Sequence, residues 1–279
     1  MDSLSLGNIK LTWLHGGIFE LDGGTMFGAV PKILWQEKFP ADKDNYIQLL
    51  NAPLLLQTEE FNVVIDTGLG NKFTEKQREI FRVTSEWAIP ESLNEAGLRR
   101  EDIHYVILTH GDFDHSGGIM MHTDKGEPEL TFPKAQHVFQ YQEWQDITNT
   151  NSRSAHTYWP QNFSGLKPHN NLLTFKGARE IVPGVTMHHT GGHTRGHQLV
   201  EIKGSEGSAI HLGDVLPTHA HINPLWIMAY DNFPLDVIEQ KERLLPLYAQ
   251  NDYWFTFYHD PVMKACKLDK EGEVTQTAP

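Results

Sequence analysis

The residues with the clearest chemical potential lie at 107–118, in the stretch ILTHGDFDHSGG. His110, Asp112, Asp114 and His115 follow a short apolar run directly. In an extended or loosely turned segment alternate side chains share one side, so the first three can converge while His115 points to a neighbouring position. We therefore expect this loop to supply ligands to two adjacent metal ions. The alternative is a capped loop whose acidic side chains are solvated.

Three residues further along the chain have the same setting. His193 lies in HTGGHTRGH, Asp214 in HLGDV and His259 in FYHDP, each at or just beyond the end of a short apolar strand. Glycines flank two of them, and glycine lets the backbone approach closely where ligands converge. Each residue alone is weak evidence. Together with the first group, they predict a metal centre assembled from several strand ends.

The elements that must position these residues alternate between strands and helices. In the first part of the chain we expect strands over 9–17, 46–60 and 61–70, helices over 74–81 and 90–97, and a buried strand over 102–110. The first helix opens with the capping-box spacing of Thr74 and Gln77. The last strand delivers the His/Asp group to its carboxyl end, where open α/β sheets place their sites.

The second part of the chain repeats this alternation. We expect a strand and the start of a helix over 135–144, strands over 180–190, 197–204 and 208–216, a helix over 234–250 and a strand over 253–260. The strands come in two sets with helices between them. This pattern predicts an α/β fold in which two sheets pack together and helices cover them.

Length, charge and cysteine content limit the class of protein. A chain of 279 residues fits one compact domain over 1–279. It has no apolar stretch near the roughly 18 residues of a membrane span and no basic, apolar leader, so we expect a cytoplasmic protein without a membrane partner. The single cysteine, Cys266, excludes an internal disulfide. The net charge of −13 argues against a nucleic-acid partner.

The order of these residues resembles the metallo-β-lactamase-fold hydrolases. Their signatures match, in chain order, Asp66-Thr67-Gly68, then His110-Gly111-Asp112-Phe113-Asp114-His115, then His193, Asp214 and His259. The stretch TGGHTRGH is similar to the Thr-Pro-Gly-His-Thr-Pro-Gly-His form of lactonase and glyoxalase-type members. The segment at 22–40, DGGTMFGAVPKILWQEKFP, resembles the branch that holds quorum-quenching N-acyl-homoserine lactonases and methyl-parathion hydrolase-like enzymes.

The resemblance implies an αββα sandwich with a dinuclear metal site at one edge. One metal would be held by His110, Asp112 and His193, the other by Asp114, His115 and His259, and Asp214 would bridge them. Asp66 would steady the His-rich loop, and His197 would orient a neighbour rather than bind metal. The cofactors would be two divalent ions, zinc first, with manganese, iron or cobalt as alternatives.

The implied activity is hydrolysis of a small-molecule lactone or ester, an N-acyl-homoserine lactone first. Asp114 would be the catalytic residue, passing a proton to the leaving oxygen while ligating a metal. Phosphotriester or aryl ester hydrolysis is the nearest alternative, and a diiron redox protein of the same fold is another. A nuclease or phosphodiesterase is disfavoured by the net negative charge of the chain. A metal-free binding module is the last alternative.

The substrate pocket departs from the family pattern. Lactonases of this fold often have a Tyr three residues after the bridging Asp, and Pro217 occupies that position here. Candidates to replace it are Thr218, His219, His221 and Tyr230. Met26, Phe27, Trp35 and Trp226 either wall an apolar pocket for an acyl chain or belong to the core. A homodimer formed through the N-terminal insertion is a further possibility that the resemblance implies.

Asp112 stands where the family has its second His, and we expect it to ligate directly. The alternative is that it contacts its metal only through water, which would leave that site weak. A carboxylate adds negative charge and a hard oxygen, which favours manganese, iron or cobalt beside zinc. Asp112→Ala and Asp112→His should therefore change metal stoichiometry or hydrolysis rate, measured by metal analysis and a rate assay. If neither substitution changes either quantity, Asp112 is not a ligand.

Overall fold

The computed structural model describes residues 1–278, which contain two seven-stranded sheets and two two-stranded sheets. The first sheet contains, in spatial order, β1 (Ser3–Ser5), β2 (Lys10–Trp13), β5 (Leu54–Gln57), β6 (Asn62–Ile65), β7 (Tyr105–Ile107), β10 (Gln136–Gln140) and β11 (Leu172–Phe175). The second contains β12 (Ala178–Val182), β13 (Val185–His189), β14 (Gln198–Lys203), β15 (Ser208–His211), β16 (Trp254–Thr256), β17 (Ala265–Leu268) and β18 (Val274–Ala278). The two-stranded sheets are β3 (Ile18–Asp22) with β4 (Tyr46–Leu50) and β8 (Met120–His122) with β9 (Pro128–Leu130).

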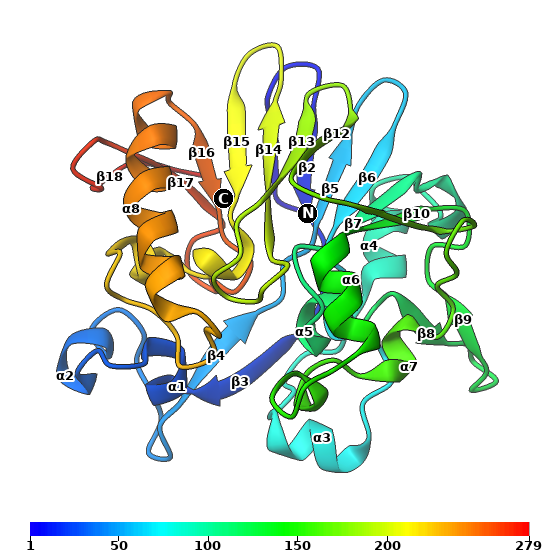
Figure 1. Cartoon of the computed structure of the whole chain (residues 1–279), viewed down its shortest axis with the longest axis horizontal. Coiled ribbons are helices and arrows are strands. Elements are labelled where there is room, and N and C mark those ends of the chain that lie inside the picture. The colour runs from blue at the N-terminus through cyan, green and yellow to red at the C-terminus, as the bar shows by residue number, and fades with distance from the viewer. Residues whose placement is uncertain (279) are drawn as a thin grey trace.

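Helices cover the outer faces of both sheets. In Figure 1, α8 lies on one side of the pair of sheets, while α4 and α6 lie on the other. The α-helices are α1 (Gly23–Phe27), α2 (Lys32–Trp35), α3 (Glu75–Ile80), α4 (Ile89–Glu95), α5 (Phe113–Ser116), α6 (Tyr141–Thr148), α7 (Pro160–Phe163) and α8 (Pro234–Gln250). The 3-10 helices are η1 (Arg100–Asp102), η2 (Ser154–His156), η3 (Gly213–Val215) and η4 (His219–Ile222).

The hydrophobic residues form three layers that match this sandwich. Between the sheets, side chains such as Ile65, Val138 and Ile202 pack together and are inaccessible to solvent. A second cluster joins the first sheet to α4 and α7, and a third joins the second sheet to α8. Burial of apolar area on both faces of each sheet is the main force that holds such a sandwich together. The predicted αββα arrangement of two packed sheets is confirmed.

Parallel strand pairs bring the predicted ligand loops to one edge. In the first sheet β6, β7 and β10 run parallel, so Asp66, which follows β6, and the loop after β7 emerge at the same end. In the second sheet β15 and β16 run parallel, so Asp214 and His259 also emerge together. Since carboxyl ends of parallel strands meet at one edge, residues distant in sequence become neighbours in space.

The elements differ from the sequence prediction in several places. The single strand predicted over 180–190 is a hairpin of β12 and β13, because the chain turns at Pro183 and at Gly184, whose φ is +82°. Strand β3 and its antiparallel pairing with β4 were not predicted, whereas β4 is the first part of the strand expected over 46–60. This strand pair packs with α1 and α2 in a separate hydrophobic cluster. Strands β17 and β18 were also missed. The capping box of Thr74 and Gln77 is present as predicted.

Within residues 1–278, no helix has both the length and the apolar character that crossing a membrane requires.

One buried histidine away from the ligand loops makes stability depend on pH. Burial lowers the pKa of His137 in β10 to about 4, against about 6.5 in an unfolded chain. Between pH 6.5 and pH 4 the unfolded chain therefore binds a proton at this residue that the folded chain does not bind, so stability falls as pH falls. The difference in pKa corresponds to about 3 kcal/mol lost by pH 4.

We expect His137→Leu to remove this contribution, so that its unfolding free energy falls less steeply than that of the wild type between pH 7 and pH 4. Urea unfolding at several pH values measures both profiles. Parallel profiles for the two proteins would show that His137 does not titrate in this way.

Candidate metal centre

Histidine side chains from both sheets converge at the shared edge of the sandwich. His110 follows β7 and His115 lies in α5, whereas His193 follows β13 and His259 follows β16. All of them are buried. The Nε2 atoms of His115 and His259 lie 3.1 Å apart, and the rings of His110 and His115 have centroids separated by 4.0 Å. The imidazoles therefore form one group.

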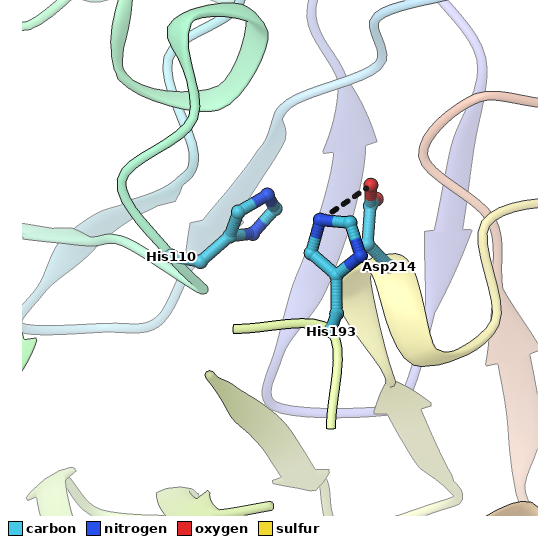
Figure 2. Close-up of side chains that lie close together, drawn as sticks. All are labelled: His110, His193 and Asp214. Carbon is cyan, nitrogen blue, oxygen red and sulfur yellow. Dashed lines mark ion pairs between the residues drawn. The ribbon is translucent and has the colours of Figure 1, made fainter. Parts of the chain in front are cut away.

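Asp214, in η3, lies between the histidines. Its Oδ1 atom is 3.2 Å from Nε2 of His115 and 3.4 Å from Nε2 of His259. Its Oδ2 atom is 3.5 Å from Nε2 of His193. Figure 2 shows His193 and Asp214 paired, with His110 on the other side of the His193 ring. One carboxylate thus faces two groups of imidazoles, as a bridging ligand would.

The other two aspartates each join one of these groups. Oδ2 of Asp112 lies 3.2 Å from Nε2 of His193 and 3.4 Å from Nε2 of His110. Oδ2 of Asp114 lies 3.5 Å from Nε2 of His259. The structure therefore brings together all of the predicted ligands in the two groups that the resemblance implies.

The donor atoms fit two divalent cations. The ligand atoms of His110, His193 and Asp214 lie within 4.8 Å of one another, and so do those of Asp114, His115 and His259. Within residues 1–278, Nε2 of His110 and Oδ1 of Asp214 are buried without a hydrogen-bond partner, a costly state for polar atoms unless something else binds them. Imidazole and carboxylate groups suit zinc and also manganese, iron or cobalt.

Asp66 fixes the orientation of the His-rich loop. It is fully buried after β6 and has a φ of +57°, in the left-handed region that Asp tolerates better than most residues. Its Oδ1 accepts a hydrogen bond from the Thr109 N–H at 2.8 Å, and its Oδ2 accepts bonds from the Thr109 hydroxyl at 2.8 Å and from Nδ1 of His115 at 2.9 Å. Nδ1 of His115 therefore carries a proton, and Nε2 faces the centre.

The remaining imidazoles are oriented through their Nδ1 atoms in the same way. Nδ1 of His193 donates to Asp231 at 2.8 Å, and Nδ1 of His259 donates to the Leu50 carbonyl at 3.1 Å. His110 bonds to the Thr109 hydroxyl at 3.0 Å. Outer partners of this kind fix the tautomer and the ring orientation of metal-binding histidines.

The carboxylates give the centre an excess of negative charge. Burial alone would lower the pKa of His115, but Asp214, Asp66 and Asp114 outweigh burial and raise its pKa well above the ordinary value. The pKa of His193 is raised for the same reason, chiefly by Asp214 and Asp112 acting against burial. The site therefore favours positive charge.

His197 lies beneath the centre and contacts main-chain groups. The Asp214 N–H donates to its Nε2 at 3.2 Å, and its Nδ1 bonds to the Thr190 hydroxyl at 2.6 Å. Burial, followed by the neighbouring His110 and His193, lowers the pKa of His197 well below the ordinary value. A neutral His197 thus connects the loop of His193 to the loop of Asp214.

A cavity of about 490 Å³ opens onto these ligands, a size common for small-molecule sites. Five of the ligands form part of its lining: Asp112, Asp114, His193, Asp214 and His259. The apolar part of the lining consists of Leu21, Met26, Leu49, Phe81, Phe113 and Met228, and polar groups come from Arg153, Tyr230 and Asn232 among others. A larger cavity of about 850 Å³ lies elsewhere and contains none of the predicted ligands.

Three of the predicted pocket residues do not line this cavity, which corrects the sequence prediction. The Phe27 ring stacks on His221 with centroids 4.8 Å apart, and Nε2 of His221 donates to the Met26 carbonyl at 2.9 Å. Thr218 bonds to Nδ1 of His221 at 2.7 Å. These side chains pack α1 against η4 and are buried there. Tyr230, the fourth prediction, does line the cavity.

Two buried acids next to the ligands were missed. Asp231 bonds to His193, and Glu143 in α6 bonds to the loops around Gly111 and Gly196. Each stands alone in the sequence, and a single acid at the start of a helix or loop looks like a solvated residue. The only available signal for Asp231 was its position directly after Tyr230, a predicted pocket residue.

Two packed sheets with outer helices, and a cluster of His and Asp at their shared edge, define a metallo-β-lactamase fold. A model of the metallo-beta-lactamase superfamily matches residues 51–250, and the chain belongs to this superfamily. The family predicted from the sequence is thereby confirmed.

The relatives agree with this assignment. An N-acyl homoserine lactonase from a Bacillus species is 29% identical over 181 residues, which make up 59% of this chain and 64% of that protein. The match thus spans just under two thirds of that relative. A solved structure of a probable metal-dependent hydrolase from Staphylococcus aureus is 40% identical, with a TM-score of 0.92, and the match covers 99% of this chain and 98% of that one. A dizinc quorum-quenching lactonase in complex with a product, at 19% identity and a TM-score of 0.76 over 96% of this chain and 93% of that one, shares the fold.

Asp66→Asn tests the support of the His-rich loop. An amide nitrogen in place of Oδ2 would face the donors of Thr109 and His115, so that His115 loses its orientation. We expect zinc affinity to fall by about 10- to 100-fold, measured by competition with a chromophoric chelator. The exposed Asp124→Asn is the control. Equal affinity in Asp66→Asn and the wild type would contradict this role.

Proposed function

We propose that this chain is a metal-dependent hydrolase that opens a lactone, an N-acyl-homoserine lactone first, or cleaves a related ester. Two divalent cations, zinc first, would be its cofactors, and quorum quenching would follow from the substrate. The observation that carries the proposal is the pair of ligand groups that both contact Asp214 and open onto a mostly apolar cavity. The relatives described as lactonases and as a metal-dependent hydrolase support it.

Each group of ligands would hold one cation, and Asp214 would contact both. Such a pair of cations, when bound, supplies an activated water at neutral pH and polarises a carbonyl oxygen. No Ser or Cys nucleophile is then required, which agrees with the position of Cys266, buried against the α8 side of the second sheet. The chain itself contributes orientation of the ligands, a binding cavity and proton transfer.

Asp114 is placed for the proton transfer. Its carboxylate belongs to the cavity lining and lies beside His259, while the Asp114 main-chain carbonyl accepts a hydrogen bond from the Tyr258 hydroxyl at 2.9 Å. Tyr258 thus fixes the backbone that carries this carboxylate. Asp114 would accept the proton that the attacking water releases and pass it to the leaving alkoxide oxygen as the ester bond breaks.

The cavity suits a substrate with an apolar chain and few polar groups. Side chains such as Leu21, Phe81 and Phe113 provide apolar surface next to the ligands. Burial of an acyl chain against such surface gains about 0.8 kcal/mol per methylene group. The side chains of Arg153 and Asn232 also line the cavity and could form hydrogen bonds with an amide group or a ring oxygen of the substrate.

We propose that Tyr230 contacts the substrate carbonyl. It would take the role of the Tyr that lactonases of this fold often have at the position of Pro217. Its hydroxyl lies 2.7 Å from Oγ1 of Thr25, and the Thr25 hydroxyl donates to the Asp22 carbonyl at 2.8 Å. The Tyr230 proton is therefore directed at Thr25, and the hydroxyl must rotate to donate to a substrate. Thr25 holds the phenol at the cavity wall until then.

A panel of substrates tests the proposed function. Acyl-homoserine lactones, aryl esters and paraoxon would be assayed with the zinc-loaded protein and after chelation. We expect lactone hydrolysis that chelation abolishes and zinc restores. Turnover of esters or paraoxon without any lactone would overturn the lactone assignment, and turnover of no substrate would overturn the hydrolase proposal.

Tyr230→Phe should lower kcat by about 10- to 100-fold, because loss of one donor to the developing negative charge costs about 1.5–3 kcal/mol. Steady-state kinetics on the best lactone measure it. The exposed Tyr141→Phe is the control, and an unchanged kcat in Tyr230→Phe would exclude a role in catalysis.

A further inference from the structure

Helix α6 lies directly against both loops that feed one of the two ligand groups. Gly111 separates His110 from Asp112, and a Cβ atom there would lie 2.9 Å from the Ile147 side chain. Gly196 follows His193 by three residues, and a Cβ atom there would lie 2.2 Å from the backbone nitrogen of Glu143. Gly196 therefore has no room for a side chain against the α6 backbone, and a Cβ atom at Gly111 would require the Ile147 side chain to shift, so both loops pack closely on α6.

The Glu143 carboxylate is bonded to both loops at once. Its Oε1 accepts hydrogen bonds from the Gly111 N–H at 2.7 Å and from the Tyr158 hydroxyl at 2.7 Å. Its Oε2 accepts hydrogen bonds from the Thr194 hydroxyl at 2.8 Å and from the Gly196 N–H at 3.1 Å. Only 1% of Glu143 is exposed to solvent, so water cannot replace these partners.

These loops belong to different sheets. The His110 loop leaves β7 in the first sheet, and the His193 loop leaves β13 in the second. A metal bound by His110, Asp112 and His193 needs a fixed distance between the two sheets at this point. Tyr158, which lines the substrate cavity, is bonded to the same carboxylate.

We propose that Glu143 is a positioning residue that sets the distance between the His110–Asp112 loop and the His193 loop, and so determines the affinity of one of the two metal positions. This inference rests on the proposed function. The other position depends on Asp114, His115 and His259, none of which bonds to Glu143.

Glu143→Gln is the most informative substitution, because Gln has the same shape but replaces one acceptor oxygen with an NH₂ donor. The hydroxyls of Tyr158 and Thr194 can rotate and accept from this NH₂ group. The N–H groups of Gly111 and Gly196 cannot rotate. In either orientation of the amide, one of the two loops therefore loses the acceptor for its backbone N–H.

The experiment is a titration of the metal-free protein with Zn²⁺ in competition with a chromophoric chelator. We expect the wild type to bind two equivalents. In Glu143→Gln one equivalent should bind about 10- to 100-fold more weakly, and the other should change by less than about threefold. Glu201→Gln is the control, because Glu201 is also a largely buried acid, bonded to Tyr253 at 2.8 Å and paired with Lys203 at 3.0 Å, outside the ligand cluster.

Thr194→Val keeps the experiment decisive if Glu143→Gln does not fold. It removes one donor to Oε2 and should weaken the same equivalent by about threefold. The role of Glu143 alone would be overturned if Glu143→Gln bound both equivalents as tightly as the wild type does. If only Thr194→Val folds, the same result for that variant would overturn it. An equal loss at both positions, or the same loss in Glu201→Gln, would also overturn it. A wild type that binds no Zn²⁺ would overturn both this inference and the proposed function.

Discussion

The structure depends on the close approach of three carboxylates, Asp112, Asp114 and Asp214, to a buried group of imidazoles. Removing carboxylates from water is costly unless opposite charge lies next to them. Protons on His115 and His193 supply part of that charge, since the carboxylates raise the pKa of both residues. Divalent cations would replace the protons at the Nε2 atoms of these histidines, supply more charge and coordinate the buried atoms that lack hydrogen-bond partners.

The two-sheet fold solves the geometric part of this problem. Each sheet delivers residues at the carboxyl ends of parallel strands, and packing of the sheets face to face brings those ends together. The centre takes ligands from both sheets, so its geometry is only as rigid as the contacts that connect the ligand loops of one sheet to those of the other. Glu143 provides such a connection by bonding main-chain groups of ligand loops from both sheets. His197 links two ligand loops of the second sheet, and Asp66 stiffens the His-rich loop from the first sheet.

The sequence predicted the centre better than its surroundings, for a physical reason. Ligands such as Asp214 and His259 stand at the ends of short apolar strands beside characteristic motifs, so type, order and local setting all carry information. The pocket residues lack such a signal. Phe27 and His221 are near the right segments in sequence, but their rings stack on each other inside the core.

Glu143 shows why outer partners escape a sequence reading. Nothing in the stretch YQEWQD distinguishes this acid from a solvated one at a helix start, because its partners come from loops that only the folded chain brings together. The hairpin at 178–189 was missed for a simpler reason. Its turn, at Pro183 and Gly184, is so short that the two strands look like one run.

The central claim is that two cations lie on either side of Asp214, and anomalous X-ray diffraction at the zinc edge from crystals of the zinc-loaded protein tests it most directly. The account predicts two anomalous peaks per chain, one among His110, Asp112 and His193 and the other among Asp114, His115 and His259. A single peak, or peaks away from these side chains, would contradict it.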